Sequence, residues 1–157
     1  MCVALVLALT PPTFAHARWL RAESPLFIVY TDGGESDLRK FTDRLERYDA
    51  FLRLLTGTTE PPAKQKMTVY LVAGSRTLSQ IWPDAPPNVL GFYSAAASGI
   101  AAVAIRAEGE SLMINAQQVL FHEYAHHFML QYYPGAYPTW YQEGFAEFCS
   151  TVDFTPL

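Results

Sequence analysis

The chain has 157 residues, of which 50% are apolar and 17% are charged, and its formal net charge at pH 7 is −4. This composition is typical of a single globular domain and unlike that of a disordered chain. Because the net charge is negative and no basic run occurs, nothing in the sequence supports a nucleic-acid partner or an anionic membrane surface.

An export signal is expected at the N-terminus. Residues Cys2 to Leu9 form a short apolar run, a pair of prolines follows it, and Ala15-His16-Ala17 has the small-x-small form of a cleavage site. We therefore expect residues 1–17 to be a bacterial-type signal peptide and residues 18–157 to be one exported domain, periplasmic or secreted. The apolar run is too short to span a bilayer.

A strand and a long helix are the first elements expected after this signal. Residues Pro25 to Thr31 form a β-branched and aromatic run that ends at Asp32-Gly33-Gly34, which predicts a strand and a turn. Apolar residues then recur at three- and four-residue spacing until Gly57, which predicts a helix whose apolar face packs on a sheet. These apolar residues are Leu38, Phe41, Leu45, Tyr48, Leu52 and Leu55.

Further strands and a short helix are expected in the middle of the chain. Lys66 to Ala73 predicts a strand, and Ser75 to Trp82 predicts a short helical stretch. Val89 to Ser94 and Ile100 to Arg106 predict a hairpin whose second strand leads toward the next helix. Residues 89–105 are uncharged, but their alanines, glycines and serines are only weakly apolar, so we expect no stable membrane span.

Two helices are expected in the last third of the chain. The first is predicted to have its N-cap at Asn115 and to end near Tyr133, where Pro134 follows. Apolar side chains lie nearly all round this helix, which indicates that it is buried. They are Val119, Leu120, Phe121, Tyr124, Phe128, Met129 and Leu130. The second helix is predicted to have its N-cap at Thr139, and Gly144 is expected to let the two helices approach closely.

The first of these helices carries His122-Glu123-Tyr124-Ala125-His126. Positions i and i+4 share one face of a helix, so His122 and His126 can direct two imidazole nitrogens at one metal ion. Glu123 lies about 100° further around the helix, where its carboxylate can take a proton from a metal-bound water instead of binding the metal. This H-E-x-x-H arrangement predicts a hydrolase with Zn²⁺ as its cofactor.

The segment Trp140 to Ala146 resembles the W-L-N-E-G-F-A segment of aminopeptidase-N-like enzymes, with Tyr141 and Gln142 in place of the Leu and Asn. Together with H-E-x-x-H, it makes the chain similar to the gluzincin metallopeptidases, a peptidase MA-like family that includes thermolysin-like enzymes. The chain is also similar to bacterial exported domains of uncharacterised function. The resemblance implies that Glu143 is the third ligand of one zinc ion per chain, which leaves the fourth position open for water.

Glu147 and His127 lie close to the expected ligands in sequence. Glu147 shares a helix face with Glu143, and thermolysin-like enzymes place an acidic residue at this position to accept a hydrogen bond from a ligand histidine. We therefore expect Glu147 to orient His122, with a solvated surface carboxylate as the alternative. His127 points about 100° away from His126, so we expect a structural or solvent-facing residue rather than a fourth ligand.

The resemblance implies an α+β, zincin-like fold with a small mixed or antiparallel sheet, a long N-terminal helix and an active-site helix pair. It implies a zinc metallopeptidase that cleaves peptide or protein substrates, with Glu123 as the general base. An edge strand beside the metal binds extended substrate in this family, and Gly99 to Ile105 is the candidate here, with a plain core hairpin as the alternative. The sequence does not rank the donors available to stabilise an oxyanion. These are Tyr132, Tyr133, Tyr137 and Tyr141.

Two other functions stay open at this point. One is a catalytically inactive zincin-like module that binds peptides, and the other is a structural domain of an envelope assembly, for which four protein ligands to zinc would be expected. Many gluzincins continue into a helical subdomain, so a chain that ends at Leu157 is expected to be a minimal catalytic core or a C-terminally truncated domain. Cys149 is expected to be a core residue. Trp140, Tyr141 and Phe145 are expected either to line a pocket or to lie in the core.

Overall fold

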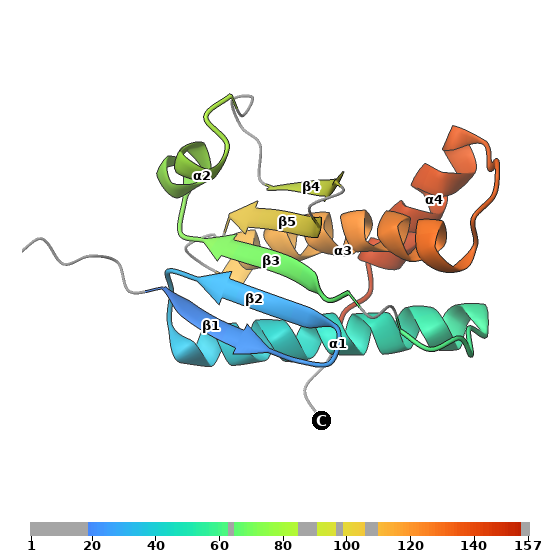
Figure 1. Ribbon diagram of the computed structural model, residues 1–157, viewed down its shortest axis with the longest axis horizontal. Helices are drawn as coiled ribbons and strands as arrows, with labels where there is room; N and C mark the ends of the chain where they lie inside the picture. The colour runs from blue at the N-terminus through green and yellow to red at the C-terminus, as the bar shows by residue number, and fades with distance from the viewer. Residues whose placement is uncertain (1–18, 63–64, 85–90, 97–98, 106–109, 155–157) are drawn as a thin grey trace, which may run out of the picture.

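A computed structural model describes residues 19–62, 65–84, 91–96, 99–105 and 110–154 (Figure 1). The expected signal peptide at 1–17, with His16, lies outside these residues. In the described part of the chain a mixed five-stranded sheet combines with four helices, which confirms the predicted α+β class. No helix in these ranges is long and apolar enough to cross a membrane.

The sheet contains a parallel centre with an antiparallel strand on each side. Its order is β1 (Leu20–Glu23), β2 (Phe27–Thr31), β3 (Met67–Val72), β5 (Gly99–Ile105) and β4 (Gly91–Ala96). β2, β3 and β5 are parallel, whereas β1 is antiparallel to β2 and β4 is antiparallel to β5. β5 is therefore an interior strand, and the prediction that it forms the edge was wrong. In the described chain that edge is β4.

The helices divide between the two faces of the sheet (Figure 1). On one face α1 (Glu35–Thr56) packs on β1 and β2, and α3 (Glu110–Tyr132) packs on β4 and β5. α2 (Ser75–Ile81) contacts β3 and β5 through Leu78, on the opposite face. α4 (Thr139–Ser150) packs against α3 rather than on the sheet.

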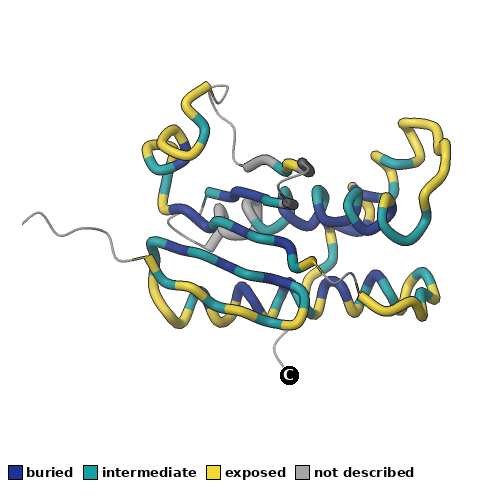
Figure 2. Tube along the Cα trace, in the orientation of Figure 1, coloured by how far each residue is buried: buried dark blue, intermediate teal, exposed yellow. Residues whose placement is uncertain are grey.

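The main core lies between the sheet and the helices α1 and α3. Buried positions alternate along β2 and β3 and recur along the two helices (Figure 2), as expected for a sheet covered on that face by helices. The Tyr48 and Phe121 rings stack with their centroids 3.9 Å apart, which joins α1 to α3 directly. Cys149 is buried in this core as predicted, and burial raises the pKa of its thiol to about 11. Leu55 and Leu130, in contrast, are exposed.

The helix termini differ from the sequence prediction more than the helices themselves do. α3 begins at Glu110, upstream of the predicted N-cap at Asn115. The N-cap of α4 is Pro138, and Thr139 is already the first helical residue. The Gln142 side chain, three residues after Thr139, donates to the backbone oxygen of Tyr137 at 2.8 Å. β1 was not predicted, because its short Leu-Arg-Ala-Glu sequence carries little β-propensity.

Gly57 ends α1 in the left-handed conformation, with a φ of 69°, and its N–H bonds to the Arg53 oxygen. A Cβ at this position would meet nothing within 4 Å, so backbone conformation alone should set the cost of substitution. We expect Gly57→Ala to lower the free energy of unfolding by about 1 kcal/mol, measured by urea denaturation. The matched control is Gly74→Ala, since Gly74 is extended and equally free of neighbours. Equal effects of the two changes would contradict this account.

Candidate metal centre

The packing of α4 against α3 brings three predicted ligands together. His122 and His126 come from α3 and Glu143 comes from α4, and one potential ligand atom from each lies within 4.8 Å of the others. The two histidines are half-buried, whereas Glu143 is exposed. The site therefore lies at the surface between two helices, with one open side.

The distances among these atoms fit the ligand spacing of a tetrahedral zinc site. The Nε2 atoms of His122 and His126 are 3.1 Å apart. One Glu143 oxygen lies 3.3 Å from the His122 Nε2, and the other lies 3.5 Å from the His126 Nε2. A zinc ion bound at about 2.0–2.1 Å requires neighbouring ligands to be roughly 3.3–3.4 Å apart. The three side chains could thus hold zinc with little movement, and their nitrogen and carboxylate donors suit that metal.

Glu147 lies beside His122, the histidine that we expected it to orient. Its carboxylate is 3.5 Å from the His122 Nδ1, the ring nitrogen that is not directed at the other ligands. This separation exceeds that of an ordinary hydrogen bond, so the pair is in position but not tightly bonded. Glu143 and Glu147 thus approach the two nitrogens of one imidazole from the same face of α4.

Glu123 is half-buried and lies one residue from His122 on α3, so its side chain belongs to the next face of the helix. Among the described residues, Glu123 is not a member of the three-residue group. His127 lies four residues further on and shares the Glu123 face. The two histidines of the candidate metal group and the Glu123 carboxylate therefore occupy adjacent faces of α3.

His127 is neither solvent-facing nor part of the metal group. Its Nδ1 lies 2.9 Å from the hydroxyl of Tyr93, on β4. Burial lowers the pKa of His127, while burial and then the charge of Glu123 raise the pKa of Tyr93. Sequence analysis missed Tyr93 because nothing in its local sequence marks a contact with a residue 34 positions away.

A buried ionic network holds α3 against α1. Asp49 on α1 is only 3% exposed; its carboxylate lies 2.6 Å from the Arg53 Nε and accepts a 2.8 Å hydrogen bond from the Tyr124 hydroxyl. Arg53 also donates to the hydroxyl of Tyr132. Tyr124 and Tyr132 both belong to α3, so this network sets the position of the helix that carries the two histidines.

Several tyrosines considered as oxyanion donors are engaged elsewhere. The Tyr132 hydroxyl bonds to Arg53, and the Tyr133 hydroxyl bonds to Thr58 at 2.7 Å. The rings of Tyr137 and Tyr141 stack with their centroids 5.3 Å apart, and both residues are exposed. Tyr132 and Tyr133 therefore serve to join the end of α3 to the end of α1.

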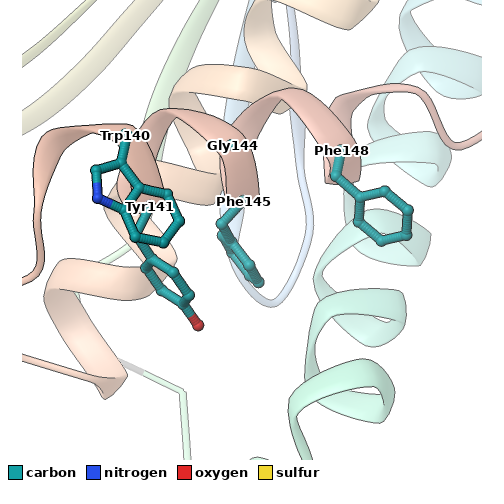
Figure 3. A pocket seen from close by; sticks show the side chains of 5 residues that line it. All are labelled: Trp140, Tyr141, Gly144, Phe145 and Phe148. Atoms are coloured by element: carbon teal, nitrogen blue, oxygen red, sulfur yellow. The ribbon is translucent and has the colours of Figure 1, made fainter.

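Aromatic side chains of α4 line a hollow of about 260 Å³ on the helix surface (Figure 3). Its lining residues are Trp140, Tyr141, Gly144, Phe145 and Phe148. Gly144 and Phe145 lie about 100° and 200° around α4 from Glu143, so the hollow belongs to other faces of the helix than the metal group. A Cβ at Gly144 would meet nothing within 4 Å, so the prediction of a close helix approach there was wrong. Trp140 and Tyr141 line this pocket as exposed residues, not as core.

Comparisons with known proteins add no family assignment to this geometry. No protein-family model matches the chain, and no curated protein matches it. The features that mark a candidate metal centre are the donor atoms of His122, His126 and Glu143 and their placement by α3 and α4.

Removing the buried carboxylate should destabilise the protein strongly. Asp49→Ala leaves Arg53 and the Tyr124 hydroxyl without their shared acceptor, and we expect it to lower the free energy of unfolding by about 3 kcal/mol. The matched control is Asp43→Ala, which breaks an equally spaced pair with Arg47 whose side chains are about half exposed. That change should cost less than about 1 kcal/mol. Similar losses for both variants in chemical denaturation would show that the network does not hold α3.

Proposed function

We propose that this chain is a zinc-dependent metallopeptidase with a zincin-like fold. The observation that carries the proposal is the spacing of the donor atoms of His122, His126 and Glu143. The two histidine Nε2 atoms are 3.1 Å apart, and they lie 3.3 Å and 3.5 Å from the two Glu143 oxygens, one each. Glu123 lies on the adjacent face of the same helix, where it can act as a base without binding the metal. Three protein ligands and a nearby base favour a catalytic site over a structural one.

The chemistry follows from the groups that the chain supplies. Zinc held by His122, His126 and Glu143 would lower the pKa of a coordinated water and polarise a substrate carbonyl. Glu123 is placed to take a proton from the attacking water and to pass it to the departing nitrogen as the C–N bond breaks. Glu147 is in position to accept a hydrogen bond from the His122 Nδ1–H, which would leave the Nε2 lone pair for the metal. The products are a carboxylate and an amine.

Substrate binding is assigned to β4. α3 packs against this strand, and β4 is the outermost described strand on that side of the sheet. An edge strand offers backbone N–H and C=O groups to an extended chain, which suits a peptide substrate in general rather than one side chain. The assignment replaces β5, whose two sides are both occupied by neighbouring strands.

The alternatives are an inactive peptide-binding module and a structural domain of the cell envelope. A structural zinc is usually closed by four protein ligands, whereas the candidate group among the described residues has three members. An inactive module would not need Glu123 beside the ligands. Zinc content and peptide hydrolysis together separate these alternatives from the enzyme.

Zinc binding is the first test. We expect the purified protein to contain about one zinc per chain by plasma mass spectrometry. Glu143→Ala should lose most of this zinc after dialysis, because it removes one of three ligands. Asp153→Ala, which changes another exposed carboxylate shortly after α4, should retain it. Wild-type protein that stays free of zinc after reconstitution would overturn the proposed function.

Glu123→Gln separates catalysis from metal binding. This variant should bind zinc like the wild type but hydrolyse a quenched fluorescent peptide library about 10²–10⁴ times more slowly, because it lacks the base. A wild-type protein that binds zinc yet cleaves no member of the library would instead support the peptide-binding module. Zinc loss in Glu123→Gln would assign the carboxylate to the metal, against its position on α3.

Glu147→Gln should weaken zinc binding without abolishing it. The Gln amide oxygen accepts a hydrogen bond from the His122 Nδ1–H more weakly than the Glu147 carboxylate does. We therefore expect the Kd for zinc to rise about 10–100-fold in a competition titration with a chelator. Glu143→Ala should give the larger loss. An unchanged Kd in Glu147→Gln would identify Glu147 as a solvated surface carboxylate.

A further inference from the structure

The edge strand β4 carries a tyrosine on the face of the sheet that the helices cover. Tyr93 pairs with Ala102 of β5, and Ala102 pairs with Val69 of β3. Ala102 and Val69 are both completely buried beneath the helices, so the same row of the sheet directs Tyr93 toward α3. At the edge of the sheet its side chain reaches the helix surface, where its hydroxyl meets the His127 Nδ1 at 2.9 Å.

The helix face that Tyr93 meets is a polar stripe. Glu123, His127 and Gln131 lie at i, i+4 and i+8 on α3, and all three are half-buried. A neutral imidazole has one N–H donor and one acceptor nitrogen, and a hydroxyl can donate or accept, so either tautomer of His127 can bond to the Tyr93 hydroxyl.

We propose that the Tyr93–His127 hydrogen bond is a positioning contact that ties the edge strand β4 to the Glu123 face of α3. An edge strand is paired on one side only, and a hydrogen bond to a rigid helix fixes its distance from that helix. The tie lies one helical turn from Glu123. If the proposed function holds, this hydrogen bond also sets where a peptide paired with β4 presents its scissile carbonyl to Glu123.

This geometry separates Tyr93 from two other roles. The Tyr93 hydroxyl is engaged with the His127 Nδ1, so we do not assign it as the donor for an oxyanion. His127 directs its Nδ1 at β4 and lies outside the group of candidate metal ligands among the described residues. Both residues are positioning residues, which act through the strand and the base.

The test compares Tyr93→Phe with wild type in the full chain. Backbone hydrogen exchange, followed by mass spectrometry, should be about 2–12-fold faster in peptides covering β4, the range that corresponds to one neutral hydrogen bond. The matched control is Tyr70→Phe, because Tyr70 stacks on Tyr30 on the opposite face of the sheet. In the double variant with His127→Leu, the two changes should be non-additive, since each removes the same bond. Additive changes, or equal exchange in wild type, Tyr93→Phe and Tyr70→Phe, would overturn the tie.

Zinc content and kinetics complete the test. Tyr93→Phe should keep the zinc content of wild type, because the ligands occupy another face of α3. If the wild type cleaves peptides, Tyr93→Phe should raise KM about 2–12-fold and change kcat little, since the loss falls on substrate placement. A lower kcat at unchanged KM would overturn the positioning role. A wild type without peptidase activity would contradict the proposed function alone, and the exchange comparison would still decide the tie.

Discussion

The rotation of α3 about its own axis is the constraint on which the candidate site depends. A helix is rigid over a few turns, so its side chains move together when it rotates. Tyr124 bonds to the buried Asp49, and Phe121 stacks on Tyr48, both on α1. These contacts flank His122 in sequence and leave the helix one rotational position. Any rotation that broke them would also carry the imidazoles away from Glu143, which reaches the group from a different helix.

The fixed rotation also explains why an ionic network is worth its desolvation cost in this core. Burying Asp49 and Arg53 is unfavourable, and an apolar pair of similar volume can give equal stability. Apolar contacts between helices, however, tolerate small rotations, whereas the hydrogen bond from Tyr124 to Asp49 is directional. We infer that the network contributes more to the placement of His122 and His126 than to net stability.

The features predicted correctly from sequence depend on local spacing. His122 and His126 share a helix face because of helix geometry alone, and the Glu143–Glu147 pair follows in the same way. The missed features depend on contacts between distant segments. β4 forms the edge because β5 pairs with β3 on its other side. Tyr93 contacts His127 because α3 packs on β4. Local capping rules placed the α3 terminus at Asn115, yet the helix continues upstream to Glu110.

The faces of α3 carry different tasks, which accounts for the density of polar residues in an otherwise apolar helix. His122 and His126 point toward α4 and Glu143, Glu123 and His127 lie toward β4, and Tyr124 faces α1. Successive residues differ by about 100°, so adjacent sequence positions serve separate partners. In the proposed enzyme, the base and the substrate strand therefore share one face while the metal occupies the next. A zinc ion and a peptide could then approach from different directions without competing for the same side chains.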